Sequence, residues 1–247
     1  MDRFHRTFAG RTAILLFAVL FSLASGSSRS SAAGSPRTSH SVGRNPTAPS
    51  LGLLRTYAVL GASAVTNTGG TAIRGDLGVS SPGISPTGFP PGTVTGKIHS
   101  GDASSAQVQG RLTSAYNFLA AKTCNTSLTG QDLGGRTLTR GVYCFTSSAQ
   151  LTGRLTLTGN ASSVFIFKIT SALNTASNSS VVMSGGSLAR NVYWQVGSSA
   201  TLGSGTAFKG NIVALTSISL GTGASLSGRA LARNGAVTLE GNAISMP

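Results

Sequence analysis

Charged residues are scarce in this chain of 247 residues. Lysine and arginine number 19, aspartate and glutamate only five, and together they make up 10% of the sequence. An ordinary soluble domain has about a quarter of its residues charged. Glycine, at 33 residues, is abundant, as are serine and threonine. Low charge with many small polar residues favours tightly turned β-structure over bundles of helices.

The scarcity of acids and histidines also excludes several classes of enzyme. Residues 53–247 contain a single histidine, His99, and four widely spaced acids: Asp76, Asp102, Asp132 and Glu240. Glycoside hydrolysis needs a pair of carboxylates, and a zinc site needs three or four clustered ligands. The spacing of His99 and Asp102 is typical of a loop and a helix cap rather than of a triad. We therefore expect no catalytic residues, no metal site and no cofactor.

The positive charge is spread rather than clustered. The formal net charge is +14, and residues 1–50 contribute six arginines to it. The 13 basic residues of 53–247 stand singly, without runs or interleaved aromatic pairs. Because nucleic-acid-binding proteins usually cluster their basic residues, we expect no nucleic-acid partner. The surplus charge suits solubility and a weak attraction to anionic surfaces such as cell envelopes.

Long hydrophobic runs are also missing. The longest, 13–24, has 12 residues, whereas a membrane-spanning helix needs about 20. A basic segment precedes this run and Ala24-Ser25-Gly26 follows it, so residues 1–26 are predicted to be a signal peptide, with an uncleaved anchor as the weaker alternative. Residues 27–52 are predicted to be a disordered Ser/Pro/Arg-rich linker, and 53–247 the folded domain. The mature protein is expected to be secreted or cell-surface associated, without a membrane span.

The chain has two cysteines, Cys124 and Cys144. In an exported protein such a pair indicates a disulfide. Two buried free thiols are the alternative, and the sequence leaves it open.

Five strand-like segments recur through the second half of the chain. They begin at residues 141, 164, 191, 211 and 229, and Ser/Gly/Thr-rich stretches separate them. A repeat on this scale is typical of a solenoid, in which each coil buries its faces against its neighbours. The segments that follow them align as Ala200-Thr201-Leu202, Ile218-Ser219-Leu220 and Val237-Thr238-Leu239. Since side chains alternate along a strand, the apolar residues should stack inward and Thr201, Ser219 and Thr238 should form an outward ladder.

One helix is predicted, from about 102 to 122. Val108, Leu112, Ala115 and Leu119 form a single apolar stripe, and Asp102 is a suitable N-cap. The stripe would be buried if the helix lay along the side of the solenoid.

Segments throughout 53–247 follow, in order, the pattern of a known family. They include Thr66-Asn67-Thr68-Gly69, Gly75-Asp76-Leu77-Gly78-Val79, Thr87-Gly88-Phe89-Pro90-Pro91-Gly92, Leu133-Gly134-Gly135-Arg136-Thr137-Leu138, Val164-Phe165-Ile166-Phe167 and Gly235-Ala236-Val237-Thr238-Leu239. The chain resembles the ice-binding-like family, long called a domain of unknown function, whose characterised members are microbial antifreeze proteins. The resemblance implies an all-β-dominated fold, a discontinuous right-handed β-solenoid of triangular section with one long helix packed alongside.

The resemblance also implies a function, namely adsorption to ice through one flat Thr/Ser-rich face, with inhibition of ice growth or recrystallisation. Some active members carry a loose Thr-Ala/Gly-x-Thr/Asn pattern, which Thr175-Ala176-Ser177-Asn178 matches and Thr222-Gly223-Ala224-Ser225 nearly matches. The candidates for the ice face are Thr175, Asn178, Thr201, Thr206, Ser219, Thr222 and Thr238. Gly203 and Glu240 interrupt the regularity of the ladder.

Two functions remain open at this point. The first is a secreted ice-binding protein, expected to be monomeric and to have an ice surface as its partner. The second is a cell-envelope or adhesion module on the same scaffold, which would bind polysaccharide or an anionic surface. The basic domain and linker motivate the second.

Overall fold

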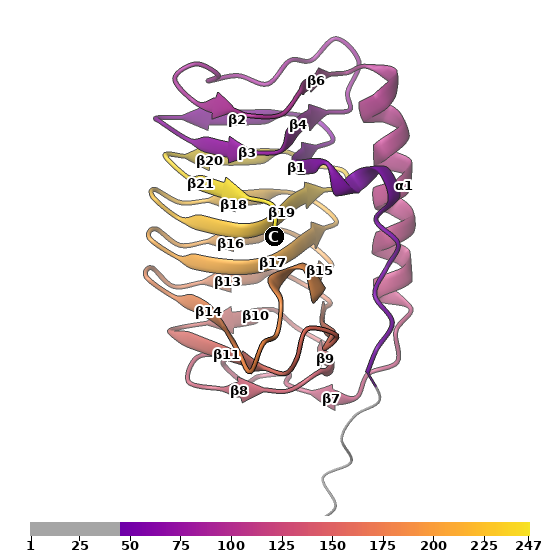
Figure 1. The fold of residues 1–247 in the computed structure, drawn as a ribbon, viewed down its shortest axis with the longest axis vertical. Coiled ribbons are helices and arrows are strands. Elements are labelled where there is room, and N and C mark those ends of the chain that lie inside the picture. Colours follow the sequence, from indigo (N-terminus) through magenta and orange to yellow (C-terminus); the bar gives the residue numbers. More distant parts are fainter. Residues whose placement is uncertain (1–44) are drawn as a thin grey trace, which may run out of the picture. The chain divides into compact units, whose positions relative to one another are not determined.

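A computed structural model describes residues 45–247, which fold into a β-solenoid flanked by one helix (Figure 1). The predicted signal peptide, and the predicted linker as far as residue 44, lie outside the described residues. All pairings between strands are parallel, and they arrange the coils into three rows, which confirms the solenoid prediction.

The first row lies under the helix and is formed by nine strands in spatial order. They are β6 (Ile98–Ser100), β4 (Asp76–Val79), β1 (Tyr57–Gly61), β19 (Ser225–Ala232), β17 (Ala207–Ala214), β15 (Val192–Val196), β12 (Phe165–Ile169), β9 (Gly141–Phe145) and β7 (Thr126–Ser127).

The second row is a separate six-stranded sheet. Its strands are β10 (Ala149–Leu151), β13 (Leu173–Thr175), β16 (Ala200–Leu202), β18 (Ile218–Leu220), β20 (Val237–Glu240) and β2 (Val65–Thr68).

The third row shares β17 and β19 with the first. Its other strands are β8 (Thr137–Leu138), β11 (Arg154–Thr158), β14 (Ser180–Ser184), β21 (Ala243–Ser245), β3 (Ala72–Arg74) and β5 (Thr93–Val94).

Two glycines let β17 and β19 pass from the third row to the first. The backbone of Gly210 has φ +109°, a value that residues with a side chain rarely adopt. Gly228 pairs with Gly210 in the neighbouring coil, and a Cβ on Gly228 would lie 1.8 Å from the Gly210 carbonyl oxygen. The corner therefore needs glycine in both coils.

The solenoid is discontinuous, as predicted, because the two ends of the folded region meet within it. Strand β2 pairs with β20 and β1 pairs with β19, so the first coils continue the stack where the last coils end. Helix α1 (Ala103–Ala120) then runs along the side of the solenoid to its far end, where β7, β8 and β9 lie (Figure 1).

Helix α1 has the cap and the buried stripe expected from the sequence. The Asp102 carboxylate accepts a hydrogen bond of 2.7 Å from the Ser105 amide. Val108, Leu112, Ala115 and Leu119 are buried. They pack in one cluster with the outward apolar side chains of the first row, which include Val142, Ile166, Tyr193, Val213 and Leu231.

The interior of the coils holds a stack of aromatic rings. The rings of Tyr143 and Phe167 have centroids 5.4 Å apart, those of Phe167 and Trp194 3.9 Å, and those of Trp194 and Phe208 4.8 Å. Trp194 is fully buried, and its indole N–H donates to the Lys209 carbonyl. Trp194 is thus a core residue with its one polar group satisfied.

The packed region extends further toward the N-terminus than the predicted start at Leu53. The Asn45 side chain donates to the Ser162 carbonyl over 2.8 Å and accepts from the Val164 amide over 2.9 Å. Leu51 and Leu54 are buried with α1, the latter within the short 3-10 helix η1 (Gly52–Arg55). Residues 45–52 therefore belong to the folded domain and not to a linker. The second short helix, η2, spans Ala189–Asn191.

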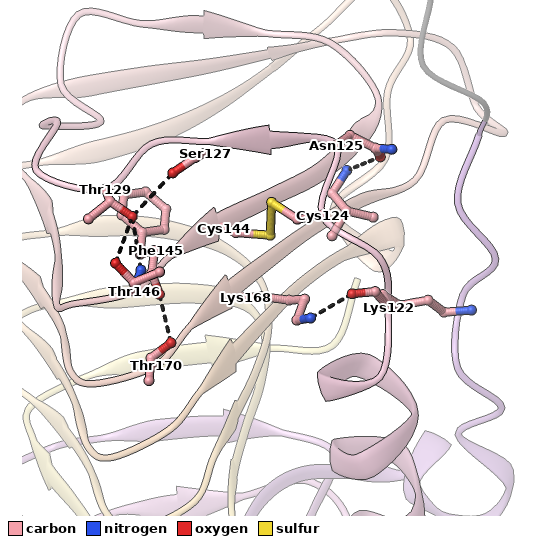
Figure 2. Close-up of a disulfide and its surroundings, with 11 residues drawn as sticks. Lys122, Cys124, Asn125, Ser127, Thr129, Cys144, Phe145, Thr146, Lys168 and Thr170 are labelled. Carbon is pink, nitrogen blue, oxygen red and sulfur yellow. Dashed lines mark hydrogen bonds between the residues drawn. A yellow bond between two sulfur atoms is a disulfide. The ribbon is translucent and has the colours of Figure 1, made fainter.

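The disulfide between Cys124 and Cys144 is present, which confirms that prediction (Figure 2). It joins the segment after α1 to β9, with Cα atoms 5.9 Å apart. Lys168 on the next strand donates to the Lys122 carbonyl over 2.5 Å. These two links attach the end of the helix to the solenoid.

Candidate functional site

The outer side of the second row carries at least one polar side chain per coil. The register of the sheet places Thr201 beside Ser219 and Ser219 beside Thr238, as predicted from the alignment of the coils. The full ladder, in spatial order, is Gln150, Asn174, Thr201, Ser219, Thr238, Thr66 and Thr87. Neighbouring rungs are about 4.8 Å apart, the strand spacing of a sheet.

The alternation of side chains along each strand explains the ladder. Ala200, Ile218 and Val237, each just before a rung, are fully buried in the core. The rung that follows must then point outward. Threonine suits such a position because its branched Cβ restricts χ1 and holds the methyl and hydroxyl groups in place. The outer side is thus a rigid array of small polar groups.

Four rungs of the ladder were not among the sequence candidates. Gln150 and Asn174 could have been found, since each stands in the same alternating position one or two coils earlier, as in Ala149-Gln150-Leu151. Thr66 and Thr87 carry no such sequence signal. They join the ladder only because the first coils stack on the last ones.

Two of the sequence candidates, Thr175 and Thr206, lie inside the molecule. Thr175 is 8% exposed and Thr206 is fully buried. Thr175 follows the rung Asn174 and so points inward, in register with the buried Leu151. The Thr175 and Thr206 hydroxyls are 3.0 Å apart, and the Gly203 amide donates to the Thr175 hydroxyl over 2.9 Å. Burial removes both residues from any surface that meets a ligand, and their role is to close the corner.

Asn178 and Thr222, two further candidates, are exposed but are not rungs. Both lie in the turns between the second and third rows. Asn178 has φ +60°, and the Thr222 carbonyl accepts from the Gly205 amide of the preceding coil. They border the ladder at its corner.

The two irregular positions noted in the sequence lie beside the ladder. Gly203 follows the rung Thr201 by two residues, and a Cβ there would lie 2.7 Å from the Thr175 carbonyl oxygen. No larger residue fits without a shift. Glu240 is paired with Thr68 and is exposed, so a charge stands at this edge.

The opposite edge of the ladder has a column of serines. The hydroxyls of Ser148, Ser199 and Ser217 accept from backbone amides of the next coil at 3.4, 3.3 and 3.3 Å. These bonds tie successive coils together next to the rungs and add to the rigidity of the array.

The three rows differ in what their outer sides offer. The first is covered by α1. The third carries the cations Arg154, Lys209 and Arg74 and a shallow hollow of about 400 Å³. The rungs of the second row are uncharged. The Glu240 carboxylate stands at one edge of the ladder, and the Asp132 carboxylate accepts from the Thr152 amide directly after β10.

Residues 45–247 contain no group of three or more histidine, cysteine or acidic side chains that could hold a metal ion. No helix within the same residues is long and apolar enough to cross a membrane. His99 Nδ1 is 2.7 Å from Asp102 Oδ2. Hydrogen bonds from the Ser105 amide and from His99 lower the pKa of the Asp102 carboxyl, so this pair stabilises the helix cap.

Fold and site together define a discontinuous β-solenoid with a flanking helix and one uncovered, uncharged ladder of small polar side chains. The chain belongs to the Ice-binding-like family, whose sequence model matches residues 59–245.

Similar sequences and similar solved structures support this assignment. The chain is 56% identical over 198 residues to the "Ice-binding protein" of Nostoc sp. (strain HG1), a match that covers 79% of this chain and 73% of the relative. A crystal structure of an ice binding protein from an Antarctic Biological Consortium superposes with a TM-score of 0.80 and is 47% identical, covering 83% of this chain and 93% of that one. The ice-binding protein of Antarctomyces psychrotrophicus has a TM-score of 0.79 and 38% identity over 81% of this chain and 99% of its own. These matches give no support to the alternative of an envelope module.

Proposed function

We propose that this protein binds ice through the ladder of the second row. The observation that carries the proposal is the seven-rung uncharged array from Gln150 to Thr87, on the one row of the described solenoid that neither the helix nor basic side chains occupy. The relatives named as ice-binding proteins supply the identity of the partner.

Rigidity is the physical basis of this binding. The inner rungs are held by strand pairing on both sides, and a fully buried residue precedes each of Thr201, Ser219 and Thr238. An array that is already ordered loses little conformational entropy when it meets a surface. Methyl and hydroxyl groups repeated at strand spacing then hold surface water in a regular lattice. Adsorption needs no covalent chemistry, so the protein acts without catalysis or a cofactor.

Within this proposal the seven sequence candidates have different roles. Thr201, Ser219 and Thr238 contact ice as rungs. Asn178 and Thr222 border the face at its corner. Thr175 and Thr206 support the face from inside.

We also propose that the protein is secreted and acts as a monomer. The basic segment and apolar run within residues 1–26 support export. The disulfide fits the same compartment, since such bonds persist in oxidising surroundings. Analytical ultracentrifugation and N-terminal sequencing of the exported protein test both statements.

The decisive experiment measures thermal hysteresis and ice recrystallisation with the purified protein and two variants. Thr201→Tyr inserts a bulky ring into the middle of the ladder, and we expect it to lower both activities severely. Ala207→Tyr places the same ring at an exposed position of the third row and should leave both activities unchanged. Loss of activity in the second variant alone would place the working face on the third row. An inactive parent protein would refute the proposal itself.

A further variant tests the edge of the face. Glu240 organises water around its own charge rather than in a lattice, so Glu240→Gln is expected to raise activity. A fall in activity would show that the carboxylate takes part in binding.

A further inference from the structure

Three arginines line one hollow of the molecule, away from the ladder of the second row. Arg55, Arg190 and Arg229 border a space of about 460 Å³. They come from three different elements, namely η1, η2 and β19. The rest of the lining consists of Ala48, Pro49, Leu51, Asn191, Tyr193 and Pro247.

Arg229 is the buried member of this group. It is only 7% exposed. One terminal nitrogen donates to Asn211 Oδ1 over 2.8 Å and the other to the Arg55 carbonyl over 2.9 Å. Its Nε has no hydrogen-bond partner. Both acceptors are neutral, so the buried guanidinium has hydrogen bonds but no compensating charge.

No acidic side chain of the described residues lines the hollow. In residues 45–247 no acidic side chain lies within ion-pair distance of Arg55, Arg190 or Arg229. Asp76 lines a neighbouring hollow together with Arg55, and its Oδ1 accepts from the Lys97 amide. A buried charge without an opposite partner is strongly unfavourable. The arrangement therefore favours an anion in this place.

The electrostatics of the neighbouring groups agree with this geometry. Burial lowers the pKa of Arg229, and the charge of Arg55 lowers it further, while Tyr193 opposes the change. Burial raises the pKa of Tyr193, while the charges of Arg229 and Arg55 oppose the rise. A phenol is protonated at neutral pH and can donate a hydrogen bond.

We propose that the hollow between Arg55, Arg190 and Arg229 is a binding site for an oxyanion, a phosphate or sulfate group. Guanidinium groups present paired N–H donors that match the oxygens of such an ion. Charge-assisted hydrogen bonds of this kind are stronger than hydrogen bonds between neutral groups. The volume exceeds that of one small ion, so the hollow also has room for part of a molecule that carries the group. Phosphate itself and a phosphate monoester share this chemistry.

Occupation of the site has a structural consequence. Ala48, Pro49 and Leu51 form one wall, while Arg190 and Arg229 belong to the solenoid. A bound anion would join the two sides and hold the N-terminal segment against the coils. The ladder of the second row has no part in this contact.

The test uses isothermal titration with inorganic phosphate, and in a parallel arm with glucose 6-phosphate, at constant ionic strength. Arg190→Gln is the main variant, because Arg190 lines the hollow, is exposed and is not part of the core. Arg154→Gln removes the same charge from the third row and is the matched control. We expect saturable binding to the parent protein and to Arg154→Gln, and binding about tenfold weaker in Arg190→Gln. Stronger binding of the monoester would identify the larger molecule as the ligand.

Hydrogen exchange gives a second readout that a general salt effect would not move. Amides of residues 50–56 should exchange more slowly in phosphate than in chloride for the parent and for Arg154→Gln, and show no such change for Arg190→Gln. Absence of saturable binding, or an equal loss in both variants, would overturn the proposal. Ice recrystallisation should be the same in all three proteins, which separates this site from the ice face.

Discussion

The hydroxyl oxygens of Thr175 and Thr206 lie 3.0 Å apart inside the solenoid, shielded from solvent. Thr206 also donates to the Ala176 carbonyl, and Thr175 accepts from the Gly203 amide. The pair thus satisfies backbone groups at the corner where the second row turns into the third. Thr175 and Thr206 are therefore interior residues, whereas Thr201 lies on the surface.

Thr175→Val should destabilise the fold without changing the ice face. The variant leaves the Gly203 amide without its acceptor, and an unpaired buried donor costs about 1–3 kcal/mol. Urea unfolding should show this loss, while recrystallisation inhibition by the folded protein stays normal.

Thr201→Val is the matched control, because the same chemical change is made at an exposed rung. We expect a change in stability below about 0.5 kcal/mol and a lower ice activity. The reverse pattern in the two variants would contradict the division between buried and outward threonines.

Asp102 should make the stability of the protein depend on acid pH. Its pKa is lowered in the folded state, so its contribution is complete above the ordinary aspartate pKa of about 3.9 and is lost as the pH falls toward the lower folded value. Asp102→Ala should cost about 1 kcal/mol at neutral pH through loss of the cap. Thermal unfolding followed from pH 7 to pH 2 measures both effects.

Asp102→Asn serves as the control for charge. Asparagine is an equally good N-cap, so this variant should keep most of the stability at neutral pH. It cannot titrate, and its unfolding temperature should fall less steeply in acid. Parallel pH profiles of the parent protein and Asp102→Asn would show that Asp102 does not cause the loss of stability in acid.

Two glycines should respond to alanine in opposite directions. Gly110 lies in the exposed middle of α1 with open space around its Cα, and Gly110→Ala should stabilise by roughly 0.5–1 kcal/mol. Gly228→Ala would place a methyl group 1.8 Å from the Gly210 carbonyl oxygen, and we expect it to prevent formation of the corner. Expression yield and unfolding midpoints separate the two outcomes. A stable Gly228→Ala protein would show that the corner can open.

Local patterns predicted much of the fold. The stripe from Val108 to Leu119 predicted the buried face of α1, and Asp102 its beginning. The alternation around Thr201, Ser219 and Thr238 predicted three rungs of the ladder. Side chains alternate along a strand and recur every three or four residues along a helix, so such features can be read from neighbouring residues.

Local patterns did not separate all threonines correctly. The short Thr-Ala-x-Asn match predicts Thr175 on the surface, but Thr175 follows an outward residue and so points inward. Thr206 lies in a turn, where alternation gives no orientation. Whether a turn residue is buried depends on the coil above or below it.

The order of residues along the chain by itself determined the solenoid, the helix with its cap and the alternation that creates an outward ladder, because each depends on contacts between residues close in sequence or one coil apart. Only the tertiary structure decided how far the ladder extends and where the arginines meet. Thr66 becomes the neighbour of Thr238, and Arg55 the neighbour of Arg229, because the first coils stack on the last. This stacking brings together residues more than 170 positions apart, and no local sequence pattern predicts it.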